Sequence, residues 1–568
     1  MEKLWLKNYP EGVPAEVDVT QYASLVDLME EAFSAYATRN AYAFMDRFTT
    51  FGELDRLSAA LAAWLQSRGI KPGTRVAIMM PNVVQYPVAV AGVLRAGCVV
   101  VNVNPLYTPR ELEHQLKDSG AEVIVILENF AATLQQVIGR TQVKHVIVAS
   151  MGDLLGFPRG VIVNFAVRRI KKMVPQYTLP GSLRFNDVLD EGARQQLQKV
   201  KLGPDDIAFL QYTGGTTGVS KGATLTHRNL VANVLQLDAW VQPALKDTSR
   251  GPVPEQLVYV CALPLYHVFA LTVNLLGGLR LGSLNVLIPN PRDLPGFVKE
   301  LAKFKFHVLP GVNTLYNALA ENEDFRKLDF SSLRIANGGG MAVQQAVAEK
   351  WLKITGIPII EGYGLSETSP IATCNPITAR EYTGTIGIPV SSTEIAILDD
   401  AGQPVPLGQP GEIAIRGPQV MAGYWQRPEE TEKVMTPDGF FKSGDVGIMD
   451  ENGYIRIVDR KKDMIIVSGF NVYPNEVEGV VAMHPGVVEC AAIGVPDEKS
   501  GEAVKVFVVR KDSDLDAAQL AAWCKEHLTG YKKPKYIEFR DELPKSNVGK
   551  ILRRELRDGK PAEQAKSA

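Results

Sequence analysis

Apolar residues follow two kinds of spacing over roughly the first 310 residues of the chain. Segments with helical spacing alternate with short, continuous apolar runs, which are typical of strands buried in parallel sheets. The helical spacing predicts helices over residues 24–36, 51–68, 85–95 and 108–119, and the runs predict strands over residues 75–80, 98–105 and 121–128. This order predicts an α/β fold in which helices cover parallel sheets.

The pattern changes in the second half of the chain. Gly, Asp and Pro recur from about residue 384 to 458, which predicts a β-rich subdomain with many turns. After the charged run DRKKD at 459–463, the spacing predicts a small α+β domain whose final residues form a disordered tail.

Two long stretches without charge, 76–94 and 257–279, raise the question of a membrane span. Prolines and polar residues interrupt both, including Pro81, Pro87 and His267, so we expect buried soluble structure. The N-terminus lacks the apolar core of a signal peptide, which favours a cytoplasmic protein.

Composition narrows the function classes. The 568 residues include 61 Lys or Arg and 63 Asp or Glu, a net charge of −2, which argues against a nucleic-acid partner. Five scattered cysteines and seven histidines form no close group with metal-ligand spacing, so we expect neither disulfides nor a zinc site.

One segment, residues 160–174, is both basic and amphipathic. Val163, Val167, Ile170 and Val174 recur at helical spacing, and they alternate with Arg168, Arg169, Lys171 and Lys172. Two interpretations stay open: a surface helix packed on its own domain, and a contact with anionic lipid on the inner face of the cytoplasmic membrane.

The clearest chemistry lies in residues 206–230, where a strand-like run enters a loop rich in glycine and hydroxyl groups. Backbone N–H groups of such a loop converge on an anion, and a lysine adds positive charge. The spacing is not that of a Walker A loop. The candidate phosphate-binding residues are Thr213, Gly214, Gly215, Thr216, Thr217, Gly218 and Lys221.

The string YTGGTTGVSKG resembles the phosphate-binding signature of the adenylate-forming superfamily, which includes acyl-CoA synthetases, aryl-CoA ligases and luciferases. Further motifs follow in the order typical of that family, and the whole chain is most similar to bacterial long-chain fatty acid–CoA ligases. These motifs are LPLYH (263–267), ANGGG (336–340), EGYGLSET (361–368), SGD (443–445), DRKKD (459–463), SGFNVYPNEVE (468–478) and PKSNVGKILRREL (544–556).

The resemblance implies a large N-terminal domain (1–458), a hinge (459–462) and a mobile C-terminal domain (463–568). It also implies that ATP and CoA are co-substrates, that Mg²⁺ is a cofactor, and that a fatty acid supplies the carboxylate that is activated. A homodimer is left open.

Nucleotide-binding roles also come from the resemblance. Thr213 and Glu367 would hold Mg²⁺, a hard ion that prefers oxygen ligands, and Thr368 would donate to the α-phosphate. Tyr363 would stack on the adenine, and Gly339 and Gly340 would let the backbone approach it closely. Asp445 and Arg460 would hold the ribose hydroxyls, and Ile457 would line the same pocket.

The resemblance assigns the chemistry to Lys550, a mobile cation that bridges the carboxylate and the α-phosphate during adenylation. His267 would lie near the reacting carbonyl. Thiolysis by CoA would follow rotation about Asp459–Lys462, with Ser468 and Gly469 lining the CoA channel and the basic final stretch attracting CoA phosphates.

Residues 438–445 read DGFFKSGD, whereas the family commonly has DGWLHTGD, so Phe440, Lys442 and Ser443 depart from the pattern. This makes the preference for acyl-chain length less certain. The expected activity is ligation of long-chain fatty acids to CoA, feeding fatty-acid degradation. The alternatives are a medium-chain or aryl-CoA ligase and a non-catalytic lipid- or nucleotide-binding component of fatty-acid uptake. A fatty acyl-AMP ligase fits less well, because no insertion follows residue 463.

Overall fold

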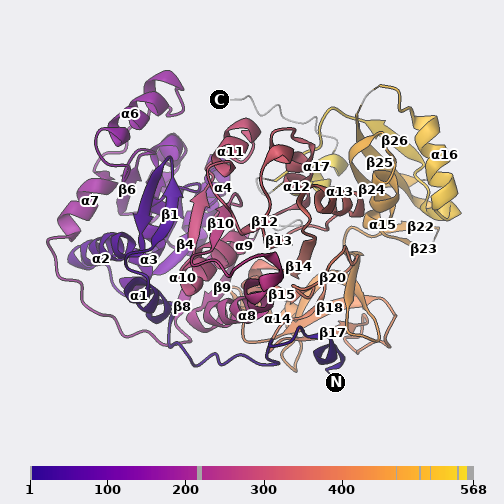
Figure 1. Cartoon of the computed structure of the whole chain (residues 1–568), viewed down its shortest axis with the longest axis horizontal. Helices are drawn as coiled ribbons and strands as arrows, with labels where there is room; N and C mark the ends of the chain where they lie inside the picture. The colour runs from indigo at the N-terminus through magenta and orange to yellow at the C-terminus, as the bar shows by residue number, and fades with distance from the viewer. Residues whose placement is uncertain are drawn as a thin grey trace.

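The computed structural model describes residues 3–213, 220–468, 470–497, 500–511, 513–546 and 549–558, apart from the side chains of Arg250 and Arg460. Their strands form four sheets (Figure 1). Two large sheets make up most of the molecule, a four-stranded sheet lies beside them, and a five-stranded sheet belongs to the C-terminal part.

The strands of each sheet follow in their spatial order. The nine-stranded sheet contains β16 (Ile388–Pro389), β15 (Ile371–Cys374), β14 (Ile359–Gly364), β13 (Ile335–Gly338), β12 (Val308–Gly311), β10 (Val258–Cys261), β11 (Leu284–Leu287), β1 (Asn40–Phe44) and β2 (Arg47–Thr50). The eight-stranded sheet contains β19 (Gly423–Tyr424), β9 (Lys221–Thr226), β8 (Ile207–Thr213), β4 (Val99–Asn102), β3 (Arg75–Met79), β5 (Val123–Leu127), β6 (His145–Ala149) and β7 (Leu183–Arg184). The four-stranded sheet contains β17 (Glu394–Leu398), β18 (Gly411–Arg416), β20 (Phe441–Met449) and β21 (Ile455–Arg460). The five-stranded sheet contains β23 (Phe470–Val472), β22 (Ile465–Val467), β25 (Gly501–Arg510) and β24 (Val487–Asp497), with β26 (Tyr536–Phe539) paired to β25.

The helices fall into two groups along the chain. Those before the charged run are α1 (Leu25–Ala35), α2 (Phe51–Ser67), α3 (Gln85–Arg95), α4 (Pro109–Ser119), α5 (Ala131–Gln135), α6 (Arg159–Phe165), α7 (Phe185–Gly192), α8 (His227–Lys246), α9 (Val268–Ala270), α10 (Gly277–Leu281), α11 (Leu294–Leu301), α12 (Asn313–Glu321), α13 (Gln345–Thr355) and α14 (Pro428–Val434). Those after it are α15 (Pro474–Ala482), α16 (Ala517–His527) and α17 (Arg553–Arg557).

The α/β prediction is confirmed, because β3, β4, β5 and β6 pair in parallel at the centre of their sheet. Helix starts follow the sequence signals. Thr50, Thr108 and Thr226 each accept the N–H of the third helical residue, and that residue's side chain returns the contact.

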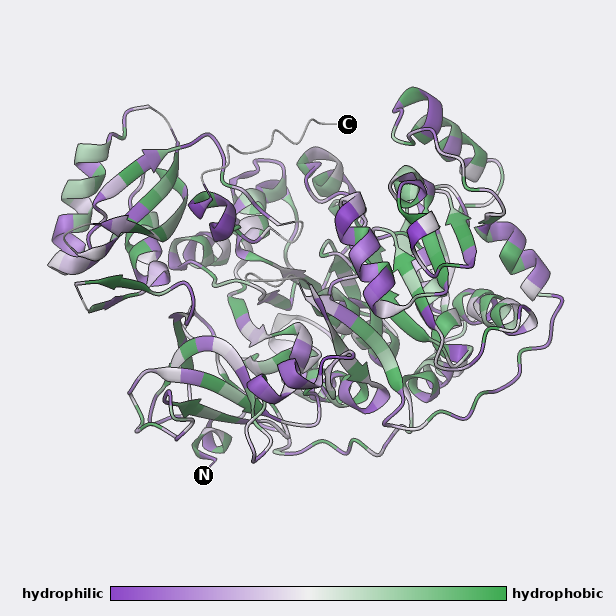
Figure 2. Cartoon of the chain, turned by 180° about the vertical axis from the view of Figure 1, so that it is seen from behind, coloured by the Kyte–Doolittle hydropathy of each residue, from purple (hydrophilic) through white to green (hydrophobic). Residues whose placement is uncertain are grey.

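The two uncharged stretches form buried elements of the fold, as predicted. Residues 76–94 contribute to β3 and α3, and α3 is buried along nearly its whole length. Among the described residues, no helix has both the length and the apolarity to cross a bilayer. In Figure 2 the apolar residues concentrate in the strands between the helices.

Parallel strands place their C-terminal ends where ligands usually bind in α/β folds. β8 ends at Thr213, directly before the candidate phosphate loop, while β13 ends at Gly338 and β14 at Gly364. The fold therefore brings Thr213 and Lys221, on either side of that loop, close to the glycine run and the EGYGLSET motif.

Candidate functional site

A single cavity of about 1210 Å³ connects the ends of these strands with the C-terminal part of the chain. Its lining joins residues from motifs that are more than 300 positions apart. The predicted site residues that line it are Thr213, Lys221, His267, Gly339, Gly340, Tyr363, Glu367, Lys462 and Lys550.

Charged and hydroxyl side chains line the part of the cavity next to the phosphate loop. Lys221 forms an ion pair with Glu430, and its ammonium lies 5.1 Å from the ring centre of Tyr424. The Tyr424 hydroxyl donates to Oε1 of Glu367 at 2.8 Å. The Lys221 ion pair lowers the pKa of Glu430 to about 2, so this carboxylate is charged at neutral pH.

Residues that were predicted to hold the adenosine also come together. The Tyr363 hydroxyl donates to Oδ2 of Asp445 at 2.7 Å, and Asp445 is buried. Asp445 lies directly opposite Arg460 in the β20–β21 pair. A Cβ at Gly339 would lie 3.2 Å from the Gly362 carbonyl oxygen, so glycine lets the backbone approach closely there, and Gly340 has φ +74°, which favours glycine.

His267, near the middle of the sequence, and Lys550, near its C-terminal end, line the same cavity. Nδ1 of His267 accepts the Phe269 N–H at 3.3 Å. Burial and, to a smaller extent, the charge of Lys550 lower the pKa of His267 to about 4, so the imidazole is neutral at neutral pH. The Lys550 turn is closed by Ser546, whose Oγ accepts the Lys550 N–H at 3.1 Å.

A second, apolar part of the cavity lies among buried side chains. Phe269, Val273, Val308 and Val312 line it, and all four are buried. Leu237, Trp240 and Val241 of α8 line it as well. An extended apolar chain fits such an arm.

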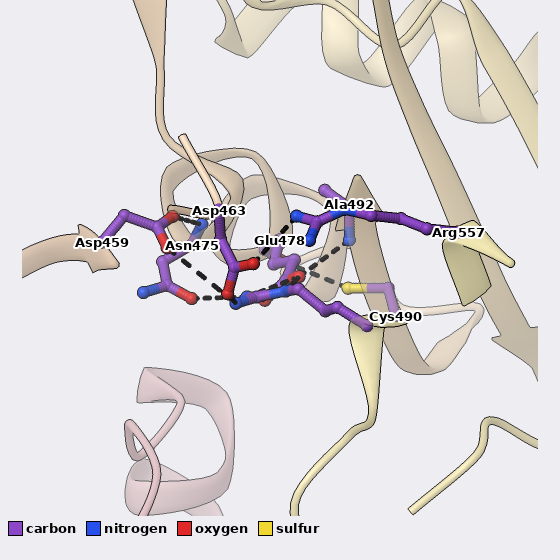
Figure 3. Close-up of polar contacts among 8 residues, drawn as sticks. Asp459, Asp463, Asn475, Glu478, Cys490, Ala492 and Arg557 are labelled. Carbon is purple, nitrogen blue, oxygen red and sulfur yellow. Dashed lines mark hydrogen bonds and ion pairs between the residues drawn. The ribbon is translucent and has the colours of Figure 1, made fainter. Parts of the chain in front are cut away.

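The first residue of the predicted hinge and residues that follow the hinge meet in a cluster of charges, which we call the hinge cluster. It consists of Asp459, Asp463, Asn475, Glu478, Arg553 and Arg557. Figure 3 shows its carboxylates converging on the arginine side chains between β21 and α15.

Other predicted residues lie away from the cavity lining within the described part of the chain. Thr368 is fully buried and donates its hydroxyl to the Pro370 carbonyl. Ile457 lies on β21 opposite Gly447, and the Ser468 N–H donates to the Ser500 carbonyl at 2.8 Å. Gly214, Gly215, Thr216, Thr217, Gly218 and Gly469 lie outside the described residues.

Tyr424 and Glu430 are site residues that the sequence prediction missed. Strand β19, which carries Tyr424, pairs with β9, which carries Lys221. This pairing joins segments about 200 residues apart, and neither residue belongs to a motif that names phosphate chemistry. Only the sheet topology reveals the contact.

Comparisons with known proteins agree with this geometry. The family model described as AMP-binding enzyme matches residues 29–425, and that of the AMP-binding enzyme C-terminal domain matches residues 476–550. The chain is 56% identical to a long-chain-fatty-acid–CoA ligase of Escherichia coli O6:H1 and 57% identical to one of Yersinia pestis, with 98% of each chain covered. The crystal structure of an anthranilate CoA ligase with anthranoyl-AMP matches with a TM-score of 0.83 at 27% identity, covering 95% of this chain and 98% of the other.

Proposed function

Because the chain belongs to the AMP-binding enzyme family, we propose that it joins long-chain fatty acids to CoA in an ATP-dependent reaction. The observation that carries this proposal is one cavity with an apolar arm and a charged mouth, in a chain that is 56% identical to long-chain-fatty-acid–CoA ligases. The product would feed fatty-acid degradation.

The reaction has two half-reactions. A carboxylate oxygen attacks the α-phosphorus of ATP, the bond to the bridging oxygen breaks, and pyrophosphate leaves. The CoA thiol then loses its proton and attacks the carbonyl carbon, and AMP leaves as the carbon–oxygen bond breaks. The first step brings two anions together, so fixed positive charge near the transferring phosphorus lowers its barrier.

For the first half-reaction, Lys550 supplies that positive charge between the carboxylate and the α-phosphate. Lys221 and the loop after Thr213 hold the outer phosphates, and Tyr363, Asp445 and Arg460 hold the adenosine. Support comes from the common cavity of Lys550, Lys221 and Tyr363. His267, neutral at this site, orients the carboxylate by hydrogen bonding without adding charge.

Mg²⁺ fits the donors in the mouth. Glu367 presents a buried carboxylate to the cavity, and Thr213 lines the same wall with its hydroxyl. One carboxylate together with substrate phosphates is a common magnesium environment. When bound, the ion would neutralise phosphate charge, while Tyr424 fixes the Glu367 carboxylate by its hydrogen bond.

For the second half-reaction, the C-terminal domain (463–568) turns about residues 459–462, with Lys462 as pivot, and carries Lys550 out of the cavity. The Ser468–Phe470 loop then reaches the acyl-adenylate. Phe470 is 56% exposed and stacks on the partly buried Tyr531, with ring centres 4.7 Å apart, beside Lys532.

The decisive assay is CoA-dependent pyrophosphate release with fatty acids of increasing length and with aryl carboxylates. Long-chain acids should give the highest kcat/KM. A higher kcat/KM with medium-chain or aryl acids would show that the protein is a medium-chain or aryl-CoA ligase instead. ATP binding without turnover of any carboxylate would favour a non-catalytic binding protein instead.

Lys550→Ala separates the two half-reactions. We expect fatty-acid-dependent pyrophosphate exchange to fall by roughly 100-fold or more, because the bridging cation is lost. Thiolysis of supplied acyl-adenylate should remain. Lys545→Ala is a matched control, since Lys545 also lines the cavity but pairs with Glu489.

We also propose peripheral contact with anionic lipid through residues 157–174. The structure divides the apolar residues of this element between two directions. Val167 is buried, whereas Phe157, Val161, Ile162, Phe165 and Ile170 are 59–91% exposed. α6 projects from the edge of the molecule (Figure 1), so this exposed apolar set is presented outward.

Charge in this element matches an anionic surface. Arg168 binds Glu128 and Ser150, but Arg169, Lys171 and Lys172 are exposed, and in the described part of the chain none forms an ion pair. Exposed apolar residues beside lysine and arginine are typical of interfacial helices.

Co-sedimentation with vesicles tests the contact. Changing Arg169, Lys171 and Lys172 to Glu should abolish binding to vesicles rich in phosphatidylglycerol, and Phe165→Ser should weaken it. The control changes three exposed lysines elsewhere, Lys246, Lys353 and Lys525, to Glu. Equal binding by both triple variants would contradict the contact.

A further inference from the structure

Asp459 is the first residue of the hinge (459–462), but its side chain contacts residues that follow the hinge. It lies on β21, and its side chain is fully buried. Oδ2 accepts the N–H of Asn475 in the first turn of α15 at 2.8 Å, and Oδ1 lies 3.9 Å from Nη1 of Arg553. The carboxylate at the start of the hinge, on a strand that continues from the large domain, is therefore held by two residues of the small domain.

Arg553 links this carboxylate to the Lys550 turn. It begins α17, three residues after Lys550, and its Nη2 donates to both oxygens of Glu478 at 2.8 Å. The same Nη2 donates to Oδ1 of Asn475 at 2.7 Å. Arg553, Glu478 and Asn475 thus form a rigid group that moves together with Lys550.

Glu478 is held independently of the hinge. Its Oε1 accepts the N–H of Ala492 on β24 at 2.7 Å, and Cys490 donates its thiol to the Glu478 carbonyl (Figure 3). The pair of Glu478 and Arg553 therefore survives any rotation of the small domain. The contacts of Asp459 with Asn475 and Arg553 cross the hinge and depend on the orientation.

In this orientation Lys550 lines the cavity with His267 and Tyr363, as adenylation requires. Rotation about residues 459–462 would separate Asp459 from the Asn475 N–H and from Arg553. A carboxylate that loses such partners must be rehydrated, so its contacts stabilise the orientation in which they form.

We propose that Asp459 is a positioning residue, which latches the small domain in the adenylation orientation by holding Asn475 and Arg553 and so places Lys550. This proposal rests on the proposed two-step function. Opening of the latch is part of the change to the thiolysis orientation.

The test compares the two half-reactions in Asp459→Asn and Asp459→Ala. The Asn side chain can still accept the Asn475 N–H but lacks charge, whereas Ala loses both contacts. Fatty-acid-dependent pyrophosphate exchange should fall about threefold in the Asn variant and about tenfold or more in the Ala variant. Thiolysis of supplied acyl-adenylate should stay equal or become faster in both.

Asp450→Asn is the matched control. Asp450 lies between β20 and β21 and also accepts backbone N–H groups, from Asn452 at 2.8 Å and Tyr454 at 2.9 Å, but these contacts stay on one side of the hinge. Its substitution should leave the ratio of the two half-reactions unchanged.

Equal loss of both half-reactions, an unchanged ratio, or selective loss of thiolysis in Asp459→Asn would each overturn the latch. The Asn variant decides the matter if the Ala variant does not fold, because it retains shape and hydrogen bonding. Failure of the unmodified protein to form acyl-adenylate with any fatty acid would instead contradict the proposed function.

Discussion

Apolar side chains enclose the deep arm of the cavity, whereas charged side chains fill the hinge cluster, although both lie away from solvent. Trp240, Val273 and Val308 are each at most 2% exposed and gain stability from close packing. Arg553 and Asp459 gain it from specific pairing.

The difference matters for motion. A packed apolar wall has one good arrangement, because any displacement opens a void that costs free energy. Ion pairs and hydrogen bonds can be exchanged for water when a domain turns. The molecule therefore combines a fixed apolar wall in the cavity with a hinge cluster whose polar contacts can be exchanged.

Among the substitutions considered, the loss of Arg553 should destabilise the hinge cluster most. In Arg553→Met the Glu478 carboxylate loses its ion-pair partner, and Asp459 and Asp463 each lose a nearby cation, which should lower the free energy of unfolding by about 3 kcal/mol or more. Chemical denaturation would measure this loss, and hydrogen exchange in α15 would show whether it is confined to the small domain.

The control for Arg553 is Arg540→Met, because Arg540 belongs to the same domain but pairs with Glu538 at a more open site, where the two side chains are 20% and 37% exposed. We expect a loss of about 1 kcal/mol or less there. Comparable losses in the two variants would mean that the hinge cluster is no more than a surface ion-pair network.

Local structure and motif chemistry could be predicted from the sequence. Helices predicted at 24–36 and 108–119 appear as α1 and α4 within one residue at each end, because capping side chains mark their starts. Lys550, His267 and Tyr363, named from separate motifs, line one cavity.

Contacts between distant segments could not be predicted. Tyr424 reaches Glu367 only because β19 pairs with β9. In residues 160–174, the π-helical turn Ala166–Ile170 changes the direction of the side chains, so Val167 points inward while Ile170 is 70% exposed. A regular helical spacing placed both residues on one face.

Lowering the pH should destabilise the packing between α8 and α1 in the large domain before it destabilises the hinge cluster. Nδ1 of the buried His227 accepts the Leu25 N–H at 3.1 Å, and burial lowers the pKa of His227 to about 4. The stability that this neutral ring contributes is complete above pH ~6.5 and is lost as the pH falls towards 4. Burial acts to raise the pKa of Asp463, but Arg557 and Arg553 outweigh it and hold that pKa below its usual value, so its contribution is lost only at lower pH.

Thermal unfolding between pH 6.5 and 5 measures the difference. The protein should lose about 1.5 kcal/mol from His227 over this range, and His227→Gln should lose less because Gln stays neutral. If the free energy of unfolding fell equally with pH in the unmodified protein and in His227→Gln, His227 would not be the cause of the loss in stability.

The smallest effect is expected at Tyr424, where the apolar wall meets the charged mouth. Tyr424→Phe keeps the ring beside Lys221 but removes the hydroxyl that donates to Glu367. The KM for ATP should rise about threefold to tenfold, since the lost hydrogen bond is worth about 1 kcal/mol, while kcat changes less. Tyr382→Phe is the control, because its hydroxyl donates to the Val343 carbonyl at 2.9 Å and Tyr382 does not line the cavity in the described part of the chain. If the KM for ATP rose in both variants, the effect would come from a general loss of order in the large domain and not from the hydrogen bond to Glu367. The apolar wall of the cavity would then be less rigid than we infer from its packing.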